Sequence, residues 1–393
     1  MGLRGMEKGA RMKILVVNYE YPPVGGGGGR VSAQVAVELA RRGHEVRVQT
    51  ARAGDLPSRQ VTSGVDVRRV FSFRGKPDTC SVSEMAGYVV TNALPVWQAA
   101  RTWRPDVMHV HFAVPTGPVA WLAHRLTGVP YVLTAHLGDV PGGAPEQTDH
   151  LFRIVKPFTG MIWRDAAAVT AVSTHVAELA EASYGIRPVV ILNGVAGCAP
   201  EPPMPAADGV LRLLFAGRMS VQKNPVFLAK VLGALRGRPW RAVLLGDGPL
   251  RGALEEELRR KEVDGQCKMH GWADEKAVRA AMDSSDVLLM PSLSEGLPVV
   301  AVEAVARGLA ICGSAIPGLR DVLEDGVNGW ACPVNDEPAW VRALEQAMND
   351  RAVLRRRQEE SLRIAAKFDL AAVVDAYEGT LRGVAEGRGT LRA

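Results

Sequence analysis

Short apolar runs alternate with longer helix-period segments along this chain, and this alternation limits the possible folds more than any other feature. Val31, Val35 and Leu39 recur every four positions, which predicts a helix that ends at Gly43. Strands are predicted at apolar runs covering residues 13–17, 107–112, 131–134, 168–172 and 189–192. Buried strands separated by helices are typical of a mostly parallel sheet that is covered on both faces.

A proline-rich stretch at residues 200–205 divides the chain into two halves. Four of its six residues are proline, which fixes φ and lacks an N–H donor, so the stretch can continue neither a helix nor a sheet. Beyond it the alternation restarts, with apolar runs at residues 211–215, 242–245, 287–290 and 310–312. We therefore predict an α/β protein with two doubly wound Rossmann-like domains that face each other across a cleft.

The 393 residues divide into five predicted parts. These are a disordered N-terminal extension (1–11), a first domain (12–197), a proline-rich linker (198–209), a second domain (210–369) and a C-terminal helix (370–393). No apolar run reaches the roughly 18 residues of a membrane span, and the basic N-terminus lacks the apolar core of a signal peptide. The five cysteines are scattered and form no C-x-x-C pair. We therefore expect a cytoplasmic protein.

Positive charge is concentrated in the first half of the chain. Residues 1–197 carry 21 Lys and Arg against 15 Asp and Glu, a net charge of +6, whereas the remainder carries 26 against 27, a net charge of −1. Residues 68–76 mix four cations with two phenylalanines, a composition suited to an anionic membrane surface. The inner face of the membrane is therefore a candidate partner of the first half, with an ordinary solvated surface as the alternative. The basic residues form no stripe, so no nucleic-acid partner is expected.

Five consecutive glycines, Gly25–Gly29, lie between the first predicted strand and the first predicted helix. Glycine lets backbone N–H groups approach an anion closely, and the following helix N-terminus adds partial positive charge. The loop therefore predicts a cradle for a phosphate or sugar phosphate, with a flexible surface loop as the alternative. The glycines do not satisfy G-x-G-x-x-G, which disfavours a nicotinamide-dependent dehydrogenase.

Arg218 and Lys223 flank the predicted start of a helix after the strand at 211–215. Asn224 suits the N-cap and Pro225 the first helical position. Open α/β folds bind ligands at this carboxyl edge of the sheet. Two cations and a helix dipole stabilise the negative charge that grows on a departing diphosphate. Two solvated surface cations are the alternative.

Two glutamates, Glu295 and Glu303, follow the strand predicted at 287–290. Pro298 suits the first turn of the next helix, which places Glu303 about 7.5 Å along that helix at ~1.5 Å per residue. Both carboxylates can bind sugar hydroxyls, and free N–H groups near Leu297 and Val299 can hold a phosphate between them. This arrangement fits a nucleoside-diphosphate sugar. A solvated loop glutamate and a helix-face glutamate are the alternative.

These segments, in this order, resemble the retaining glycosyltransferases of group 1 (family 4, with an E-x7-E motif), which have the GT-B fold. The resemblance covers about residues 12–385. Further matches are Ala171-Val172-Ser173, Leu192-Asn193-Gly194-Val195, Gly246-Asp247-Gly248-Pro249, His270-Gly271-Trp272 and Gly326-Val327-Asn328-Gly329.

The resemblance implies a role for each matching residue. His136, Arg218, Lys223 and Glu295 would act in catalysis, and Asp139 would contact the acceptor. The donor-binding residues would be Gly26, Gly27, Gly28, Gly217, Gly248, Gly271, Trp272, Leu297, Pro298, Val299 and Glu303. The first domain would bind the acceptor and the second the nucleotide sugar, and the C-terminal helix would cross back onto the first domain.

The implied reaction moves a sugar from a nucleoside-diphosphate sugar, with UDP favoured and GDP possible, to a saccharide or lipid-linked acceptor in polysaccharide or glycoconjugate biosynthesis. The family retains the anomeric configuration. The chain contains no D-x-D sequence, so we expect no metal and no cofactor, with cations and helix N-termini holding the diphosphate. Two other interpretations remain open: a nucleotide-sugar epimerase of the same fold, and a catalytically inactive sugar-nucleotide-binding subunit.

Overall fold

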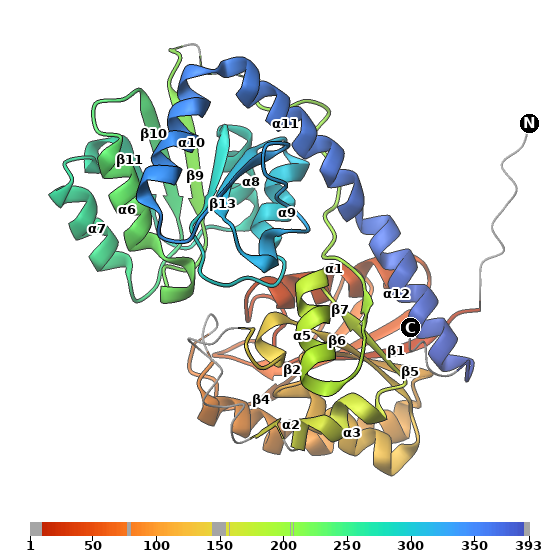
Figure 1. Cartoon of the computed structure of the whole chain (residues 1–393). Coiled ribbons are helices and arrows are strands. Elements are labelled where there is room, and N and C mark those ends of the chain that lie inside the picture. The colour runs from red at the N-terminus through yellow and green to blue at the C-terminus, as the bar shows by residue number, and fades with distance from the viewer. Residues whose placement is uncertain are drawn as a thin grey trace, which may run out of the picture.

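The computed structural model describes residues 10–76, 80–143, 155–156, 158–204, 206 and 208–388. These residues form two α/β domains, each built on its own sheet (Figure 1). The predicted N-terminal extension lies outside the described residues except for its last two positions. No helix among the described residues is both long enough and apolar enough to cross a membrane.

The first sheet has eight strands in the order β3-β4-β2-β1-β5-β6-β7-β8, parallel except for the β3–β4 pair. The strands are β1 (Lys13–Val17), β2 (Glu45–Arg52), β3 (Arg59–Thr62), β4 (Val65–Phe71), β5 (Val107–His111), β6 (Tyr131–Ala135), β7 (Ala168–Ala171) and β8 (Val189–Val190). The helices of this domain include α1 (Gly27–Arg41), α2 (Val82–Trp103), α3 (Thr116–Thr127) and α5 (Thr174–Tyr184). The central strands β5 and β6 are buried along their whole length, as expected for a sheet covered on both faces.

The second sheet is parallel and has six strands in the order β11-β10-β9-β12-β13-β14. They are β9 (Leu211–Ala216), β10 (Trp240–Leu245), β11 (Cys267–His270), β12 (Val287–Met290), β13 (Ala310–Ser314) and β14 (Gly329–Cys332). The helices are α6 (Pro225–Ala234), α7 (Arg251–Arg260), α8 (Glu275–Asp283), α9 (Val299–Ala306), α10 (Glu337–Asn349) and α11 (Arg351–Ala365). Because all strands run the same way, their carboxyl ends and the loops that follow them lie at one edge, which faces the first domain (Figure 1).

The last helix, α12 (Leu370–Ala385), continues from α11 down to the first domain (Figure 1). Its apolar face, which includes Val374, Tyr377 and Leu381, is buried against Ile14 and Val132 of the first sheet. The chain thus crosses twice between the domains. The first crossing runs along the second domain, where the Ala199 N–H donates to the carbonyl of Ala306 at 2.7 Å.

Strands β2, β3, β4, β11 and β14 were not predicted. Of these, β2, β4 and β11 alternate polar and apolar residues, and β3 has one apolar residue in four, so none of them is a continuous apolar run. Strand β14 is only four residues long and begins with glycine. The run at 189–192 gives a strand of two residues, β8. The glycine run also differs from the prediction. Helix α1 begins at Gly27, so the last three of the five glycines form its first turn instead of a loop.

Only two of the four cations in the basic stretch at 68–76 lie at the surface: Lys76 is exposed, and the Arg68 side chain is 38% exposed. Arg69 and Arg74 are 5% and 6% exposed. Arg74 lies over the Tyr19 ring and 3.8 Å from a Glu20 carboxylate oxygen. The two phenylalanines of this stretch, by contrast, are exposed.

Candidate active site

The loop after β9 carries both predicted diphosphate cations. Lys223 ends a short 3₁₀ turn, Val221–Lys223, and α6 follows at Pro225, as the sequence predicts. Asn224 does not cap this helix with its side chain: it has φ 51°, and its amide donates to Asn335 Oδ1 at 2.9 Å. A left-handed asparagine turns the chain here, so the position was predicted correctly and the capping bond was not.

Two glycines of the β10–α7 connection pack closely against the β9–α6 loop. A Cβ atom on Gly246 would lie 1.9 Å from the Gly217 carbonyl oxygen, and one on Gly248 would lie 2.5 Å from that of Met219. Both glycines also have positive φ. Gly248, predicted to bind the donor, therefore has a packing reason to be glycine, because any side chain would displace the loop that carries Arg218.

Lys223 and Glu295 form an ion pair between the β9–α6 and β12–α9 loops. Backbone and side-chain bonds join these loops: the Leu293 N–H donates to the Gln222 carbonyl at 2.8 Å, and the Gln222 amide donates to the Ser294 carbonyl at 2.9 Å. The side chains of Lys223 and Glu295 are 17% and 6% exposed. The structure thus brings together two residues that the sequence separates by 72 positions.

Arg218 lies on the same loop as Lys223 but has a different environment. Its Nε atom is buried and has no hydrogen-bond partner among the described residues. A buried guanidinium N–H without a partner is costly. Arg218 is therefore suited to bind an anion from outside the chain.

The E-x7-E segment ends in helix α9, which begins one residue later than predicted, with Pro298 at the N-cap. No side chain of the described residues caps this N-terminus, so its first N–H groups remain without helical acceptors. The Asn193 amide donates to the Leu297 carbonyl at 2.8 Å and fixes the loop just before the helix. An uncapped N-terminus at this edge can bind an anion such as a phosphate.

Glu303, on α9, pairs with Arg30 of α1 across the seam between the domains. Burial raises the pKa of Glu303 above its ordinary value, and Arg30 opposes that rise. Sequence analysis missed Arg30, which directly follows the glycine run. No local pattern identifies a partner 273 positions away.

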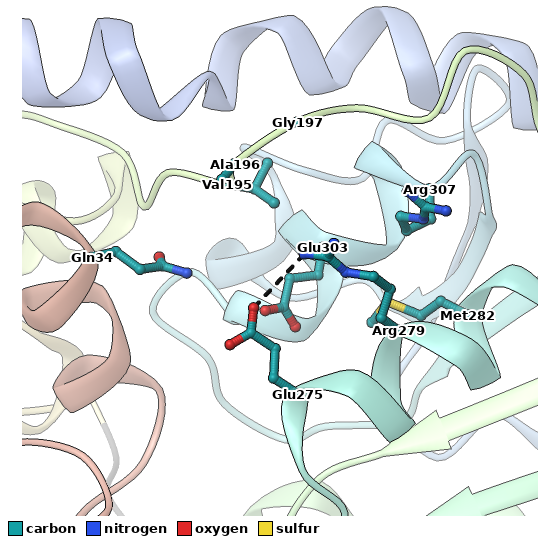
Figure 2. Close-up of a pocket in the computed structure, with 9 residues that line it drawn as sticks. All are labelled: Gln34, Val195, Ala196, Gly197, Glu275, Arg279, Met282, Glu303 and Arg307. Atoms are coloured by element: carbon teal, nitrogen blue, oxygen red, sulfur yellow. Dashed lines mark ion pairs between the residues drawn. The ribbon is translucent and has the colours of Figure 1, made fainter. Parts of the chain in front are cut away.

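A pocket lies beside Glu303 at the same seam. Figure 2 shows Gln34 of α1 extending toward Glu303, and Glu275 paired with Arg279 of α8. The full lining is Gln34, Val195, Ala196, Gly197, Glu275, Arg279, Met282, Glu303 and Arg307. Of these only Glu303 was predicted from the sequence. Trp272, in the loop before α8, is 56% exposed, and Gly271 accepts from the Gly246 N–H at 3.0 Å through its carbonyl.

The first turn of α1 contains Gly27, Gly28 and Gly29 and is called the glycine turn here. It faces the second-domain side of the seam, where α9 lies. A Cβ atom on Gly27 would lie 3.2 Å from Val299 of α9. The Gly26 N–H, predicted to bind phosphate, donates to a Glu20 carboxylate oxygen at 2.9 Å. The remaining N–H groups of the first turn have no helical acceptor, so the cradle is narrower than the sequence indicated.

His136, at the end of β6, lies beneath Gly28. Its ring stacks on Phe112, with centroids 4.1 Å apart, and a Cβ atom on Gly28 would meet both rings. Burial, with a smaller contribution from His109, lowers the pKa of His136 to about 3. The imidazole is therefore neutral at physiological pH, and it contributes a hydrogen bond and a surface instead of a charge.

Asp139 does not have the accessible position that an acceptor contact requires. It is fully buried, and its two carboxylate oxygens accept from the backbone N–H groups of His136 and Val114 at 2.7 and 3.2 Å. Burial raises its pKa to about 7, although these backbone bonds oppose the rise. Asp139 instead fixes the turn that carries His136.

The structure has two Rossmann-like domains that face each other, which is the GT-B fold. The seam between them is lined by two carboxylate–cation pairs and the uncapped N-terminus of α9. Family models match both domains: residues 204–364 match the glycosyl transferases of group 1, and residues 25–196 match Glycosyltransferase Family 4. The chain belongs to the group 1 glycosyltransferases.

Known relatives agree with this family, and a solved structure agrees with the fold. A 2-deoxystreptamine N-acetyl-D-glucosaminyltransferase of Streptomyces fradiae is 30% identical, over 80% of each chain, and a glycogen synthase of Mycobacterium tuberculosis is 28% identical, over 93% of each. The Anabaena protein HepE, solved with UDP and glucose, superposes with a TM-score of 0.76 at 18% identity, over 95% of this chain and 100% of that one.

Proposed function

We propose that this chain is a retaining, metal-independent hexosyltransferase that uses a UDP-sugar. The observation that carries the proposal is the Lys223–Glu295 ion pair, which joins the loop that also carries Arg218 to the loop that leads into the uncapped N-terminus of α9, the helix of Glu303. The solved complex of HepE with UDP supports uracil as the base of the donor nucleotide. The acceptor is a saccharide or a lipid-linked saccharide, in polysaccharide or glycoconjugate biosynthesis.

The free chain pairs both glutamates with cations, and the donor would replace those pairs. The diphosphate attracts Lys223 and Arg218, which leaves Glu295 to accept hydrogen bonds from the sugar hydroxyls. The ribose hydroxyls replace Arg30 at Glu303. The cations and the helix N-terminus then stabilise the charge that develops on the leaving diphosphate, as a metal ion would in other enzymes.

Thermal unfolding with UDP, GDP, ADP or NAD⁺, each with and without EDTA, tests the donor site. A ligand at 100 times its Kd stabilises the folded chain by about 2.7 kcal/mol. We expect a shift with UDP that EDTA does not change. A shift with NAD⁺ alone, or with none of the ligands, contradicts the assigned roles. An EDTA-sensitive shift contradicts metal independence.

Product analysis with UDP-sugars separates transfer from its alternatives. A transferase releases UDP only when an acceptor is present and forms a glycoside whose anomeric configuration NMR can report. Acceptor-independent release of UDP together with a free epimerised sugar would indicate an epimerase. UDP binding without turnover would indicate an inactive binding subunit.

We also propose that the first domain rests on an anionic lipid surface through the outer face of α2. Val82, Val90 and Leu94 on this helix are 59%, 77% and 57% exposed. Phe73 is also exposed and packs over Gly87 of the same helix. Exposed apolar side chains gathered on one helix suit an interaction surface, and the net positive charge of this half favours anionic lipid.

Vesicle sedimentation tests this surface directly. We expect the chain to sediment with phosphatidylglycerol vesicles at low salt and much less with phosphatidylcholine vesicles. The double variant Val90→Ser/Leu94→Ser should lose binding, whereas Val334→Ser, at a 40% exposed position in the second domain, should keep it. Failure of the wild type to bind anionic vesicles would exclude the lipid partner.

A further inference from the structure

Three buried histidines lie in a row behind the glycine turn of the first domain. His109 and His111 are on β5 and are fully buried, and His136 follows β6 and is 7% exposed. His111 Nδ1 lies 3.3 Å from His136 Nε2. The rings of His109 and His111 are 4.2 Å apart. Sequence analysis singled out His136 and gave no role to the other two.

The two hydrogen-bonded rings are both neutral. Burial, with smaller contributions from the neighbouring histidines, holds the pKa of His111 well below its usual value, and burial lowers that of His136 to about 3. A neutral imidazole has one N–H and one bare nitrogen. The bond between the rings therefore has two possible directions, and each direction fixes the tautomer of both rings.

We propose that His111 is a positioning residue, which donates from Nδ1 to His136 Nε2 and so keeps the His136 proton on Nδ1. That nitrogen would lie 3.3 Å from a Cβ atom on Gly28, in the first turn of α1. His136 then presents an N–H to the side where the proposed donor binds. This inference rests on the proposed function, because the ligand of that N–H is a hydroxyl or phosphate oxygen of the nucleotide sugar.

The unpaired nitrogen of His111 decides between the two directions. His111 Nε2 is buried and has no partner among the described residues. If His136 donated instead, the single proton of His111 would lie on this atom, as an N–H without an acceptor. Buried N–H groups without partners are rare and costly in folded proteins. The proposed direction leaves only a lone pair there, and it also directs an N–H toward an anionic or hydroxyl ligand.

Two amide substitutions at His111 separate the two nitrogens. The amide nitrogen of asparagine is as many bonds from the backbone as Nδ1, whereas that of glutamine reaches the position of Nε2. We expect His111→Asn to stay within about threefold of the wild-type kcat/KM, and His111→Gln to lose 10- to 100-fold, the range in which a misplaced active-site group is felt. Equal losses in the two variants would overturn the proposal.

The tautomer itself can be read without activity. Protonated and bare imidazole nitrogens have well-separated ¹⁵N chemical shifts, and the signals of His136 are identified by their absence in His136→Ala. In the 393-residue chain labelled with ¹⁵N-histidine we expect a protonated Nδ1 in the wild type and in His111→Asn, and a changed pattern in His111→Gln. A protonated Nε2 in the wild type would overturn the proposal.

His124 offers a matched control, because its Nδ1 also makes a hydrogen bond, to the Val129 carbonyl at 2.9 Å. His124→Gln should leave the His136 signals and kcat/KM unchanged. The thermal response of the wild type to UDP is recorded in parallel. If UDP does not bind but the tautomer is as expected, the proposed function fails and the role of His111 in fixing the ring stands.

Discussion

The two sides of the seam between the domains differ in the polar groups that they contribute. We call the second-domain side the charged wall and the first-domain side the neutral wall. The second domain contributes charge: Arg218, Lys223 and Glu295 lie on loops at the carboxyl edge of its sheet. The first domain contributes neutral groups, namely the glycine turn of α1 and the uncharged His136. Asp139, which accepts from the backbone N–H of His136, is also neutral below its pKa of about 7. Arg30 and Glu20 are exceptions: Arg30 extends from the first domain to Glu303 of the second, and the Glu20 carboxylate accepts from the Gly26 N–H.

This difference assigns separate tasks to the walls. A charged wall attracts and holds a diphosphate, because electrostatic interactions act over distance. A neutral, close-packed wall contributes little attraction, but it fixes the shape in which the sugar and the acceptor meet. Variants of the second domain should therefore change donor binding and turnover together, whereas variants of the first should change mainly turnover.

The largest expected effect is that of Lys223→Ala on the charged wall. We expect kcat/KM to fall by about 10²- to 10³-fold, the range reported for removing one preorganised electrostatic contact. UDP binding should weaken as well, while circular dichroism shows a folded chain. Lys230→Ala, at an exposed position on α6, is the control and should be silent. Near-normal transfer by Lys223→Ala would remove the leaving-group role.

Gly28→Ala should affect the neutral wall more selectively. The new Cβ atom would lie 2.5 Å from Phe112 Cζ and 3.3 Å from His136 Nδ1, so the rings must move. We expect kcat to fall 10- to 100-fold with the Kd for UDP changed less than about threefold. Gly252→Ala, in α7, is the control. A Cβ atom there would lie within 4 Å of no described atom outside its own helix turn, so this variant should be neutral or slightly stabilising. Equal loss of UDP binding and turnover in Gly28→Ala would contradict the division of tasks.

Asp139 defines the pH range in which the first wall is neutral. Burial raises its pKa to about 7, so the folded chain holds this proton more tightly than the unfolded chain. Its contribution to the free energy of unfolding is therefore greatest below about pH 4 and is lost as the pH rises through 7. Asp139→Asn removes this titration and replaces one of the two acceptor oxygens by an NH2 donor that faces a backbone N–H, and should destabilise by about 1–3 kcal/mol at pH 5.

Urea unfolding at pH 5, 6, 7 and 8 measures this effect. The difference between wild type and Asp139→Asn should shrink toward pH 8, because only the wild type loses stability over that range. A difference that is constant with pH would mean that Asp139 is ionised throughout, and the wall would then carry a charge beside His136 at every pH tested.

The charged wall could be predicted from the sequence because its residues lie in two short segments, each around the start of one helix. Arg218 and Lys223 precede one helix, and Glu295 and Glu303 bracket the start of another. Buried strands such as β1, β9 and β12 were also visible, since a strand covered on both faces is a continuous apolar run. The fold class followed from these strands, from the helix-period segments between them and from the proline-rich stretch that divides the chain.

The neutral wall and the pairs across the seam could not be predicted in the same way. His111 alternates with apolar residues in β5, so its contact with His136 depends on the register of β5 and β6. Arg30 reaches Glu303 only because of how the domains pack. The resemblance implied an acceptor contact for Asp139, but burial and two backbone donors give it a structural role.

Arg30→Ala has the smallest expected effect and tests whether the two walls compete for Glu303. A partly exposed ion pair of this kind contributes up to about 1 kcal/mol, which corresponds to about fivefold in affinity. If the ribose replaces Arg30, removal of Arg30 should tighten UDP binding by up to that factor. Glu303→Ala should weaken binding, since it removes the ribose contact itself. Isothermal titration with UDP measures both.

The opposite sign for Arg30→Ala would be equally informative. Weaker UDP binding would mean that Arg30 acts with the donor, as a cation contributed by the first domain, instead of against it. The neutral wall would then contribute one charge to the diphosphate, and turnover and binding would no longer separate between the domains. Combining Arg30→Ala with Lys223→Ala distinguishes these cases, because cations that bind the same diphosphate have non-additive effects.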